Sequence, residues 1–449
     1  GATGIKEKLV GTLFSTLDIG RSGIMVAQIQ MDVTAHNISN VNTEGFSRQR
    51  ATLLGRSAIS RPYGELGRGV DVGTVERIRD IFLDRVFREH VPGLGRTETM
   101  SEFFSRIEDI FLEPGENGLG TRLNLFFDAL NDFANNVEQD PVRQSVVSEG
   151  IALTSMLNEA AERLYLLRTN ANEEVENHVS NINSLSERIG LLNREIRDTE
   201  VGDTRIANDL RDQRGLLLDE LAELITVSIR ERDDGQVDVL VGSDQLINGD
   251  TYRELEAVRE ASLDPERNDL FEVRFADNGR VVDIREGTLQ GVLEIRDQAI
   301  VEVDGRLDEI ASTIIEQINR IQSQGNGTRN ITGTISSTNT TVDATTALDS
   351  AGLPFALVDG SFDVVIYDST GAVVTTKTIV IDADVTTLTD IQNALNVAPP
   401  PLADFSASIS GGNTLDITVA GGNSFVFSND TSGALTALGI NGFFTGTDA

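Results

Sequence analysis

The feature that most constrains this chain is an apolar seam through its middle. Between residues 157 and 196, twelve positions follow one another in alternating steps of four and three, and ten of them are apolar. The positions are Leu157, Ala161, Leu164, Arg168, Ala171, Val175, His178, Ile182, Leu185, Ile189, Leu192 and Ile196. This coiled-coil-like spacing predicts one helix from about residue 143 to 197, roughly 80 Å long.

Helices on both sides of this segment are expected to cover its seam. A short turn leads into a returning helix at 206–225, and the short connection implies that the two helices are antiparallel neighbours. Upstream, residues 78–111 predict a helix that stops at Pro92 and a second helix that stops at Pro114. Downstream, a further helix is expected at 288–323. Together these segments predict a long antiparallel helical bundle or rod.

Between the helices expected at 206–225 and 288–323, apolar and polar residues alternate with a period of two. Residues 227–284 contain turn signals at Asp234-Gly235 and Asn278-Gly279, each flanked by alternating apolar and polar residues. Such dipeptides favour two-residue hairpin turns. We therefore expect a small β-hairpin insert, at about residues 226–286, within the helical rod.

The composition changes near Gly325. Residues 328–449 contain twelve Asp, no Glu and two basic residues, Arg329 and Lys377, and short Thr-, Ser- and Val-rich runs predict strands. The stretch "TTLTDIQNAL" predicts one short helix with a Thr cap. The predicted fold class is α+β multidomain, with a separate β-rich domain after the rod. The expected domains are an N-terminal helix and Asn-rich turn at 1–50, a helical rod domain at 51–327, a linker at 328–340 and an outer β-rich domain at 341–449.

A second seam lies near the start of the chain. From residue 13 to 38 the same four–three alternation recurs, with small residues at several positions that would let another helix approach closely. An Asn-rich stretch follows, and its Asn and Gly residues tolerate the left-handed backbone angles that end a helix. The pattern predicts a helix and then a sharp turn. From the residues alone, this helix could either pack into a core or seek a partner.

Charge and cysteine content exclude several kinds of partner and site. The formal net charge is −34, so the chain repels phosphate backbones and anionic lipid surfaces, and we expect neither nucleic-acid nor membrane binding. The chain has no Cys, which excludes disulfides, zinc–thiolate sites and a Cys nucleophile. The first thirty residues lack an apolar core like that of a secretory signal, so any export would use a route without a cleaved signal peptide.

The sequence contains no convincing catalytic constellation. It has neither a phosphate-binding Gly-Lys-Ser or Gly-Lys-Thr loop nor a G-x-S-x-G elbow. His36, His90 and His178 lie far apart, and none has a second ligand at metal spacing. With 71 acidic residues, pairs of carboxylates arise by chance. We predict no catalytic, metal or cofactor site, and we interpret His178 as a structural residue of the long seam.

Residues near the N-terminus resemble the signature of the bacterial flagellar axial proteins, the family of rod, hook and hook-associated proteins. The matching elements are Ser22-Gly23, the run Asn37-Ile38-Ser39-Asn40, and Asn42-Thr43-Glu44-Gly45-Phe46. Within that family, His36, the "SRQR" after Phe46 and the segment "RDQRGLLLDELAEL" are similar to the hook-associated members at the hook–filament junction. The resemblance covers about residues 11–325 and the final "LGINGFFTGTDA".

This resemblance implies a non-enzymatic structural adaptor that joins hook to filament. It implies export by the flagellar type III apparatus, an extracellular location and a role in motility. The implied partners are the hook protein, a second junction protein, copies of the chain in a ring and a flagellar export chaperone. The N-terminal helix would line the inner tube. The implied assembly interface is Leu13, Leu17, Ile24, Ala27, Met31 and Ile38, and the implied turn motif is Asn37, Asn40, Asn42, Gly45 and Phe46.

Three alternatives to a junction adaptor stay open at this stage. The chain could be another axial protein, of the hook or distal rod, although the long paired helices at 143–225 disfavour this. It could be a secreted wall hydrolase on an axial scaffold, or it could carry a glycan-binding or adhesive β domain on an assembly stalk. The resemblance also implies a C-terminal helix that would pair with the N-terminal one. Because this sequence stops at Ala449, we expect it to be part of a longer protein.

Overall fold

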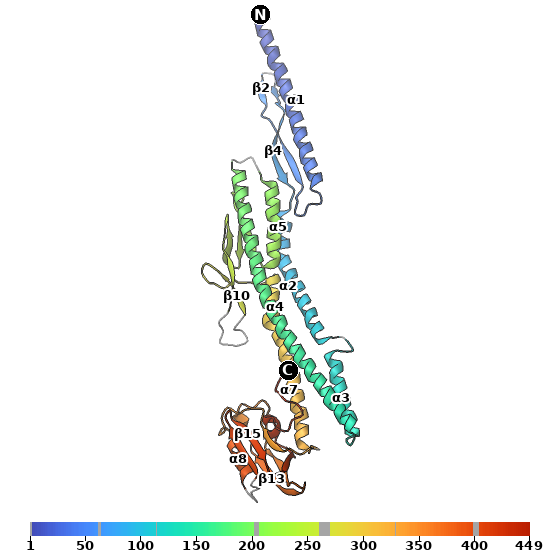
Figure 1. Cartoon of the computed structure of the whole chain (residues 1–449). Coiled ribbons are helices and arrows are strands. Elements are labelled where there is room, and N and C mark those ends of the chain that lie inside the picture. The colour runs from blue at the N-terminus through green and yellow to red at the C-terminus, as the bar shows by residue number, and fades with distance from the viewer. Residues whose placement is uncertain are drawn as a thin grey trace. The chain divides into compact units, whose positions relative to one another are not determined.

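The computed structural model describes residues 2–61, 64–113, 115–201, 206–259, 270–327, 329–397 and 404–449. The chain forms two compact units, each built from two stretches of sequence (Figure 1). The first comprises residues 1–110 and 164–300, and the second comprises residues 111–163 and 301–449. No helix in the described ranges is long and apolar enough to span a membrane.

The N-terminal part of the first unit is a long helix packed on a two-stranded ribbon. Helix α1 (Ala2–Ser39) confirms the helix expected at 13–38. It lies against the antiparallel pair β1 (Gln49–Gly55) and β4 (Val70–Arg77), and a small hairpin of β2 (Ile59–Arg61) and β3 (Gly64–Leu66) separates these strands in sequence. The turn expected after the helix is therefore present, and it returns the chain along α1.

The long seam predicted from the sequence lies on helix α4 (Asp140–Glu200). Eight of its twelve positions are buried, and the other four are half-buried. Helix α5 (Asn208–Leu224) returns beside α4 in the opposite direction (Figure 1). Its Arg211 donates to Glu200, and its Arg214 donates to Asn193 of α4 at 2.8 Å. The antiparallel helix pair is thus confirmed.

The predicted break at Pro92 is wrong. Helix α2 (Ile81–Phe111) continues through this residue. A proline in a helix removes one N–H donor and clashes with the preceding turn, at a cost of about 3 kcal/mol. Packing offsets this cost here, because Pro92 is buried and its carbonyl accepts a hydrogen bond from the Gly287 N–H at 3.1 Å. Nearby, a Cβ on Gly95 would lie only 2.8 Å from the Glu223 carbonyl oxygen, so α2 meets the end of α5 closely.

The expected β insert follows α5, with one change in strand pairing. Strands β5 (Ser228–Glu231), β6 (Val237–Val241), β7 (Asp244–Asn248) and β8 (Thr251–Tyr252) form an antiparallel sheet in that order. The turn at Asp234-Gly235 is confirmed, and Gly235 has φ of +80°. The hairpin at Asn278-Gly279 is only partial. Strand β10 (Phe271–Phe275) pairs fully with β9 (Leu255–Arg259), and the residues after Gly279 contribute a single bridge.

The expected helix at 288–323 is present in three parts. They are α6 (Thr288–Glu294), a π-helical turn (Ile295–Ala299) and α7 (Ile300–Gln324). In the second unit, α7 is accompanied by α3 (Leu119–Asn135) and the first part of α4. Phe126 of α3 is fully buried and contacts Phe443 and Phe444 near the end of the chain, with ring centroids 6.2 and 5.6 Å away.

The C-terminal β domain contains two three-stranded sheets. One has the order β13-β12-β16 and the other β11-β15-β14. Their bounds are β11 Gly333–Ser336, β12 Gly360–Tyr367, β13 Val373–Ile381, β14 Phe405–Ser410, β15 Thr414–Val419 and β16 Ser424–Ser428. The strands expected from the Thr-, Ser- and Val-rich runs are confirmed, and the core of this domain includes Phe362, Phe425 and Phe427.

Three local features of this domain bear on the sequence predictions. Helix α8 (Leu388–Asn396) begins at the expected Thr387 cap, whose hydroxyl accepts from the Asp390 N–H at 3.1 Å. The short helix α9 (Ala434–Leu438) was not expected. Residues 328–340 were expected as a linker, but β11 lies within them and pairs with β15, and Ile335 packs against the core. An apolar residue in a polar stretch can thus add a strand where a sheet edge is available.

His178 of α4 gives a pH test of the buried seam. Burial lowers the pKa of His178 below its ordinary value of 6.5, although Glu174 acts in the opposite direction. Its Nδ1 atom is buried and has no hydrogen-bond partner in the described structure. The unfolded chain therefore binds a proton more readily, and stability falls as pH drops from about 6.5 towards the lowered folded-state pKa.

We expect the His178→Leu variant to lose this acid sensitivity while keeping the fold. The measurement is urea unfolding, followed by helical circular dichroism, at about pH 7.5 and about pH 5.0. His90→Gln, at an exposed position of α2, is the matched control and should keep the pH dependence of the parent. An unchanged pH dependence in His178→Leu would contradict the assignment.

Candidate functional site

Helix α1 presents an apolar face that nothing in the described chain covers. Leu17, Ile24, Met31 and Ile38 are 62%, 72%, 65% and 69% exposed, and Ala27 on the same face is also exposed. The side chain of Leu13 lies outside the described residues. Five of the six side chains predicted as an assembly interface therefore share one open face. Exposed apolar side chains at coiled-coil spacing are typical of a surface that binds another helix.

The opposite face of α1 is anchored to the strands. Val26 is buried, and so is Ser22, whose hydroxyl donates to the Ile19 carbonyl at 2.8 Å and accepts from the Val70 N–H at 3.3 Å. Gly69, with φ of +92°, lies so close that a Cβ there would meet the Ser22 hydroxyl oxygen at 2.2 Å. The ribbon thus fixes which side of α1 stays open.

Two hollows along the open face coincide with its small residues. One is lined by Leu17, Gly20 and Ile24, among others, and the second is lined by Ala27, Met31, Ala35 and Ile38 with two polar neighbours. Large and small side chains alternate along the lining of both hollows. This relief suits the insertion of side chains from a partner helix, as in knobs-into-holes packing.

The Asn-rich turn after α1 is held by its own side chains. The Asn37 amide pairs with the backbone of Gln49, because its Nδ2 donates to the Gln49 carbonyl at 2.9 Å and its Oδ1 accepts from the Gln49 N–H at 2.8 Å. Asn40 Nδ2 donates to the His36 carbonyl at 3.0 Å, and its Oδ1 accepts from the Thr43 hydroxyl at 3.3 Å. Both Asn residues thus close the turn by satisfying backbone or neighbouring polar groups.

The remaining turn residues serve different purposes. Gly45 has φ of +75°, a left-handed angle that strains other residues, and a Cβ there would meet the Leu216 side chain at 3.3 Å. The Phe46 ring packs edge-on against His36 with centroids 5.3 Å apart. Asn42 is exposed, and its side chain makes no hydrogen bond within the described ranges. The structure therefore gives a contact for Asn37, Asn40, Gly45 and Phe46, and none for Asn42.

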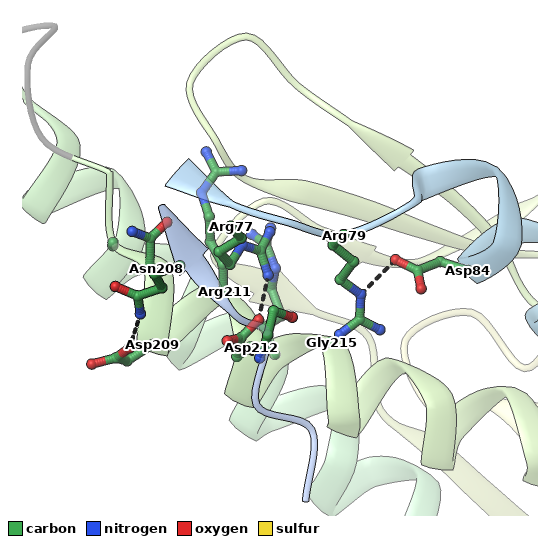
Figure 2. A network of polar contacts seen from close by, with 12 residues as sticks. Arg77, Arg79, Asp84, Asn208, Asp209, Arg211, Asp212 and Gly215 are labelled. Atoms are coloured by element: carbon green, nitrogen blue, oxygen red, sulfur yellow. Dashed lines mark hydrogen bonds and ion pairs between the residues drawn. The ribbon is translucent and has the colours of Figure 1, made fainter. Parts of the chain in front are cut away.

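The start of α5 anchors this turn, which the sequence patterns did not indicate. The buried carboxylate of Asp212 accepts from the Ser47 N–H and from Arg77, each at 2.8 Å. Asp209 accepts from the Gln49 side-chain amide at 2.7 Å, and Asn208 donates to the Val75 carbonyl at 2.7 Å. Figure 2 shows Asn208, Asp209 and Asp212 on α5 facing this network. The only sequence signal was polar residues spaced for one face of the first turns of a helix.

A second polar contact fixes the start of α5 to the end of α4. Burial by itself raises the pKa of Glu200, but hydrogen bonds from Arg211 and from the Ala207 N–H outweigh burial and lower it. Glu200 accepts from Arg211 Nε at 2.7 Å and from the Ala207 N–H at 2.9 Å. Glu200 therefore stays charged at neutral pH and keeps the anchoring residues of α5 in place.

In the part of the chain that the structure describes, no three His, Asp or Glu side chains are grouped to hold a metal ion.

Two known protein families match parts of this chain, including the segment that contains α1 and the Asn-rich turn. The family described as "Flagellar hook-associated protein FlgK helical domain" matches residues 104–335, and the family "Flagella basal body rod protein" matches residues 17–46. The first match spans more than half of the 449-residue chain. The chain belongs to the FlgK family. The rod-protein match contains the open face of α1 and the Asn-rich turn, so the resemblance stated for the N-terminal residues is confirmed.

Two individual proteins are also similar to this chain in sequence. The chain is 33% identical over 224 residues to flagellar hook-associated protein 1 of Bacillus subtilis (strain 168), covering 48% of this chain and 44% of that protein. It is 27% identical over 316 residues to the Escherichia coli (strain K12) protein of the same name, covering 69% of this chain and 57% of that protein. The chain therefore spans about half the length of the curated relatives it matches.

A solved structure also aligns with the chain. It is that of the flagellar hook junction protein FlgK from Burkholderia pseudomallei, with 20% sequence identity and a TM-score of 0.45. The alignment covers 79% of this chain and 66% of that structure.

Proposed function

We propose that this chain is the structural adaptor that joins the hook of the bacterial flagellum to its filament. Membership of the FlgK family supports this role, and two relatives are named flagellar hook-associated protein 1. The observation that carries the proposal is the open apolar face of α1, which lies inside the match to the basal body rod family. A protein that assembles through α1 needs such a face exposed before assembly and covered afterwards.

The proposed role is structural and is exerted outside the cell, at the hook–filament junction. The proposed partners are the hook protein, a second junction protein and copies of this chain in a ring, with an export chaperone before secretion. In this arrangement α1 supplies helix-to-helix contacts through Leu17, Ile24, Ala27, Met31 and Ile38. The Asn-rich turn and its anchor on α5 hold α1 at a fixed register on the rest of the first unit. The family match favours this role over the hook and distal-rod alternatives.

Substituting two seam residues by aspartate tests this role directly. In Ile24→Asp/Met31→Asp, both changes fall on exposed side chains, so the stability of the free chain should stay within about 0.5 kcal/mol. Two charges in an apolar helix interface oppose burial by several kcal/mol. We expect bacteria carrying this variant to export the protein, retain hooks and lose most filaments, as counted by electron microscopy and swimming-ring diameter.

The matched control is Val342→Asp/Val380→Asp, which places two aspartates on valines of similar exposure, 78% and 73%, in the β domain. This variant should assemble filaments normally if α1 is the decisive surface. Wild-type filament numbers in the α1 variant would overturn the assignment of this face to assembly.

A further inference from the structure

An arginine-lined cavity lies in the first unit, apart from the open face of α1. It has a volume of about 600 Å³ and is formed by the end of β4, the start of α2, and by α5 and β5. Its lining contains six arginines and three carboxylates, although the whole chain has 37 basic and 71 acidic residues. The arginines are Arg77, Arg79, Arg85, Arg88, Arg211 and Arg214. Figure 2 shows Arg77, Arg79 and Arg211 among them.

Internal ion pairs account for four of these arginines. The pairs are Arg77 with Asp212, Arg79 with Asp84, Arg88 with Asp219, and Arg211 with Glu200. Each pair fixes a guanidinium group at the wall of the cavity. An arginine has five N–H donors, so such a pair leaves some of them available to a ligand. The guanidinium groups at the cavity wall are therefore held in place and still have N–H donors available.

The other two arginines are held less closely by carboxylates: Arg214 by one distant pair and Arg85 by none in the described residues. Arg85 is exposed at the lining and forms no ion pair within the described residues. Arg214 is 4% exposed, and its Nη1 donates to the Asn193 side chain and the Gly235 carbonyl. Its nearest carboxylate oxygen, on Glu231, is 3.9 Å from Nη2. The lining thus carries three more arginines than carboxylates, because Asp212, Asp219 and Glu200 pair with these arginines but do not themselves line the cavity.

Two further observations concern polar groups at the lining that lack a strong partner. Burial, followed by the nearby charge of Arg211, lowers the pKa of Arg214 to about 10, although Glu231 and Glu200 act in the opposite direction. The Thr226 hydroxyl oxygen, also at the lining, is buried without a hydrogen-bond partner in the described structure. A buried hydroxyl without a partner is costly, and an anion in the cavity could accept a hydrogen bond from it.

We propose that this cavity binds a carboxylate side chain from an acidic segment of a neighbouring protein subunit. Carboxylates match the planar fork of a guanidinium group, and the cavity offers several such forks. The chain itself is strongly acidic, so neighbouring copies bring carboxylates that would otherwise repel one another. The neighbouring-subunit source rests on the proposed function, whereas the preference for carboxylate rests on the cavity alone.

Binding of an acidic peptide to the intact chain tests this proposal. The probe is a terminally blocked tetraglutamate peptide, titrated at low ionic strength by isothermal calorimetry, with sodium sulfate as a second probe. We expect saturable binding of one peptide per chain that weakens with added salt. In Arg85→Glu a negative charge replaces a cation that pairs with no carboxylate of the described chain, so the fold should persist and peptide affinity should fall at least tenfold.

Arg230→Glu is the matched control, because Arg230 is exposed on β5 but does not line the cavity. Peptide binding that only Arg85→Glu weakens supports the proposal. Equal weakening by both variants, binding of sulfate without binding of peptide, or no binding of either probe overturns it. The Ile24→Asp/Met31→Asp variant should bind the peptide normally, so failure of α1-mediated assembly and failure of this site give different results.

Discussion

Replacing Asp212 by alanine is expected to lower the free energy of unfolding of the first unit by about 3–5 kcal/mol. Asp212 is 4% exposed and accepts hydrogen bonds from the Ser47 N–H and from Arg77. Its removal leaves a largely buried guanidinium group and a buried N–H without an acceptor, and such groups are costly to leave unpaired. The Asn-rich turn should then detach from α5, and α1 should lose its fixed position.

Hydrogen exchange and urea unfolding measure this effect together. Exchange at the Ser47 amide should accelerate strongly in Asp212→Ala, and the unfolding midpoint should shift to lower urea. Asp209→Ala is the control on the same helix, because the Asp209 side chain is 60% exposed and binds the same turn. It should cost less than about 1 kcal/mol. Similar losses from the two variants would show that Asp212 is not the main anchor.

Replacing Phe126 by alanine is expected to cost the second unit about 3–5 kcal/mol. The ring is fully buried in α3 and contacts Phe443 and Phe444, so truncation removes apolar contacts and leaves a cavity between the helix and the end segment. Amide exchange in residues 440–449 should increase in this variant, because these residues lose the ring against which they pack.

The neighbouring residue provides the control for this variant. Phe127 is 50% exposed on the same helix, so Phe127→Ala removes the same number of atoms from a position that is half in solvent. We expect it to cost less than half as much as Phe126→Ala. If both variants shift urea unfolding of the second unit equally, the contact of α3 with the end segment does not stabilise it as proposed.

Sequence periodicity predicted a helix or strand correctly where the structure of that element depends mainly on its own residues. The four–three alternation located α4 and α1, and Thr387 marked the start of α8. Period-two runs located the strands of the β domain and the hairpin at Asp234-Gly235. Pro92 misled the prediction because the cost of a proline is local, whereas the packing of α2 that offsets it involves residues almost two hundred positions away.

Sequence patterns likewise predicted only part of the candidate site. The seam of α1 and the Asn-rich turn were visible in sequence because their spacing and turn chemistry are local. Their anchor was not, because Asp212 pairs with Ser47 and Arg77 across 165 and 135 positions. The same holds for the arginine-lined cavity, whose six arginines come from two separate stretches of sequence, 77–88 and 211–214.

The sequence by itself therefore determined the long helices α1 and α4, the turn and the family, since each depends on residues close together along the chain. The tertiary structure decided which face of α1 is open, because only packing on β1 and β4 shows that Ser22 and Val26 face inwards. It also decided which charges are balanced, because an ion pair depends on distance in space and on burial. Spacing along the chain reveals neither.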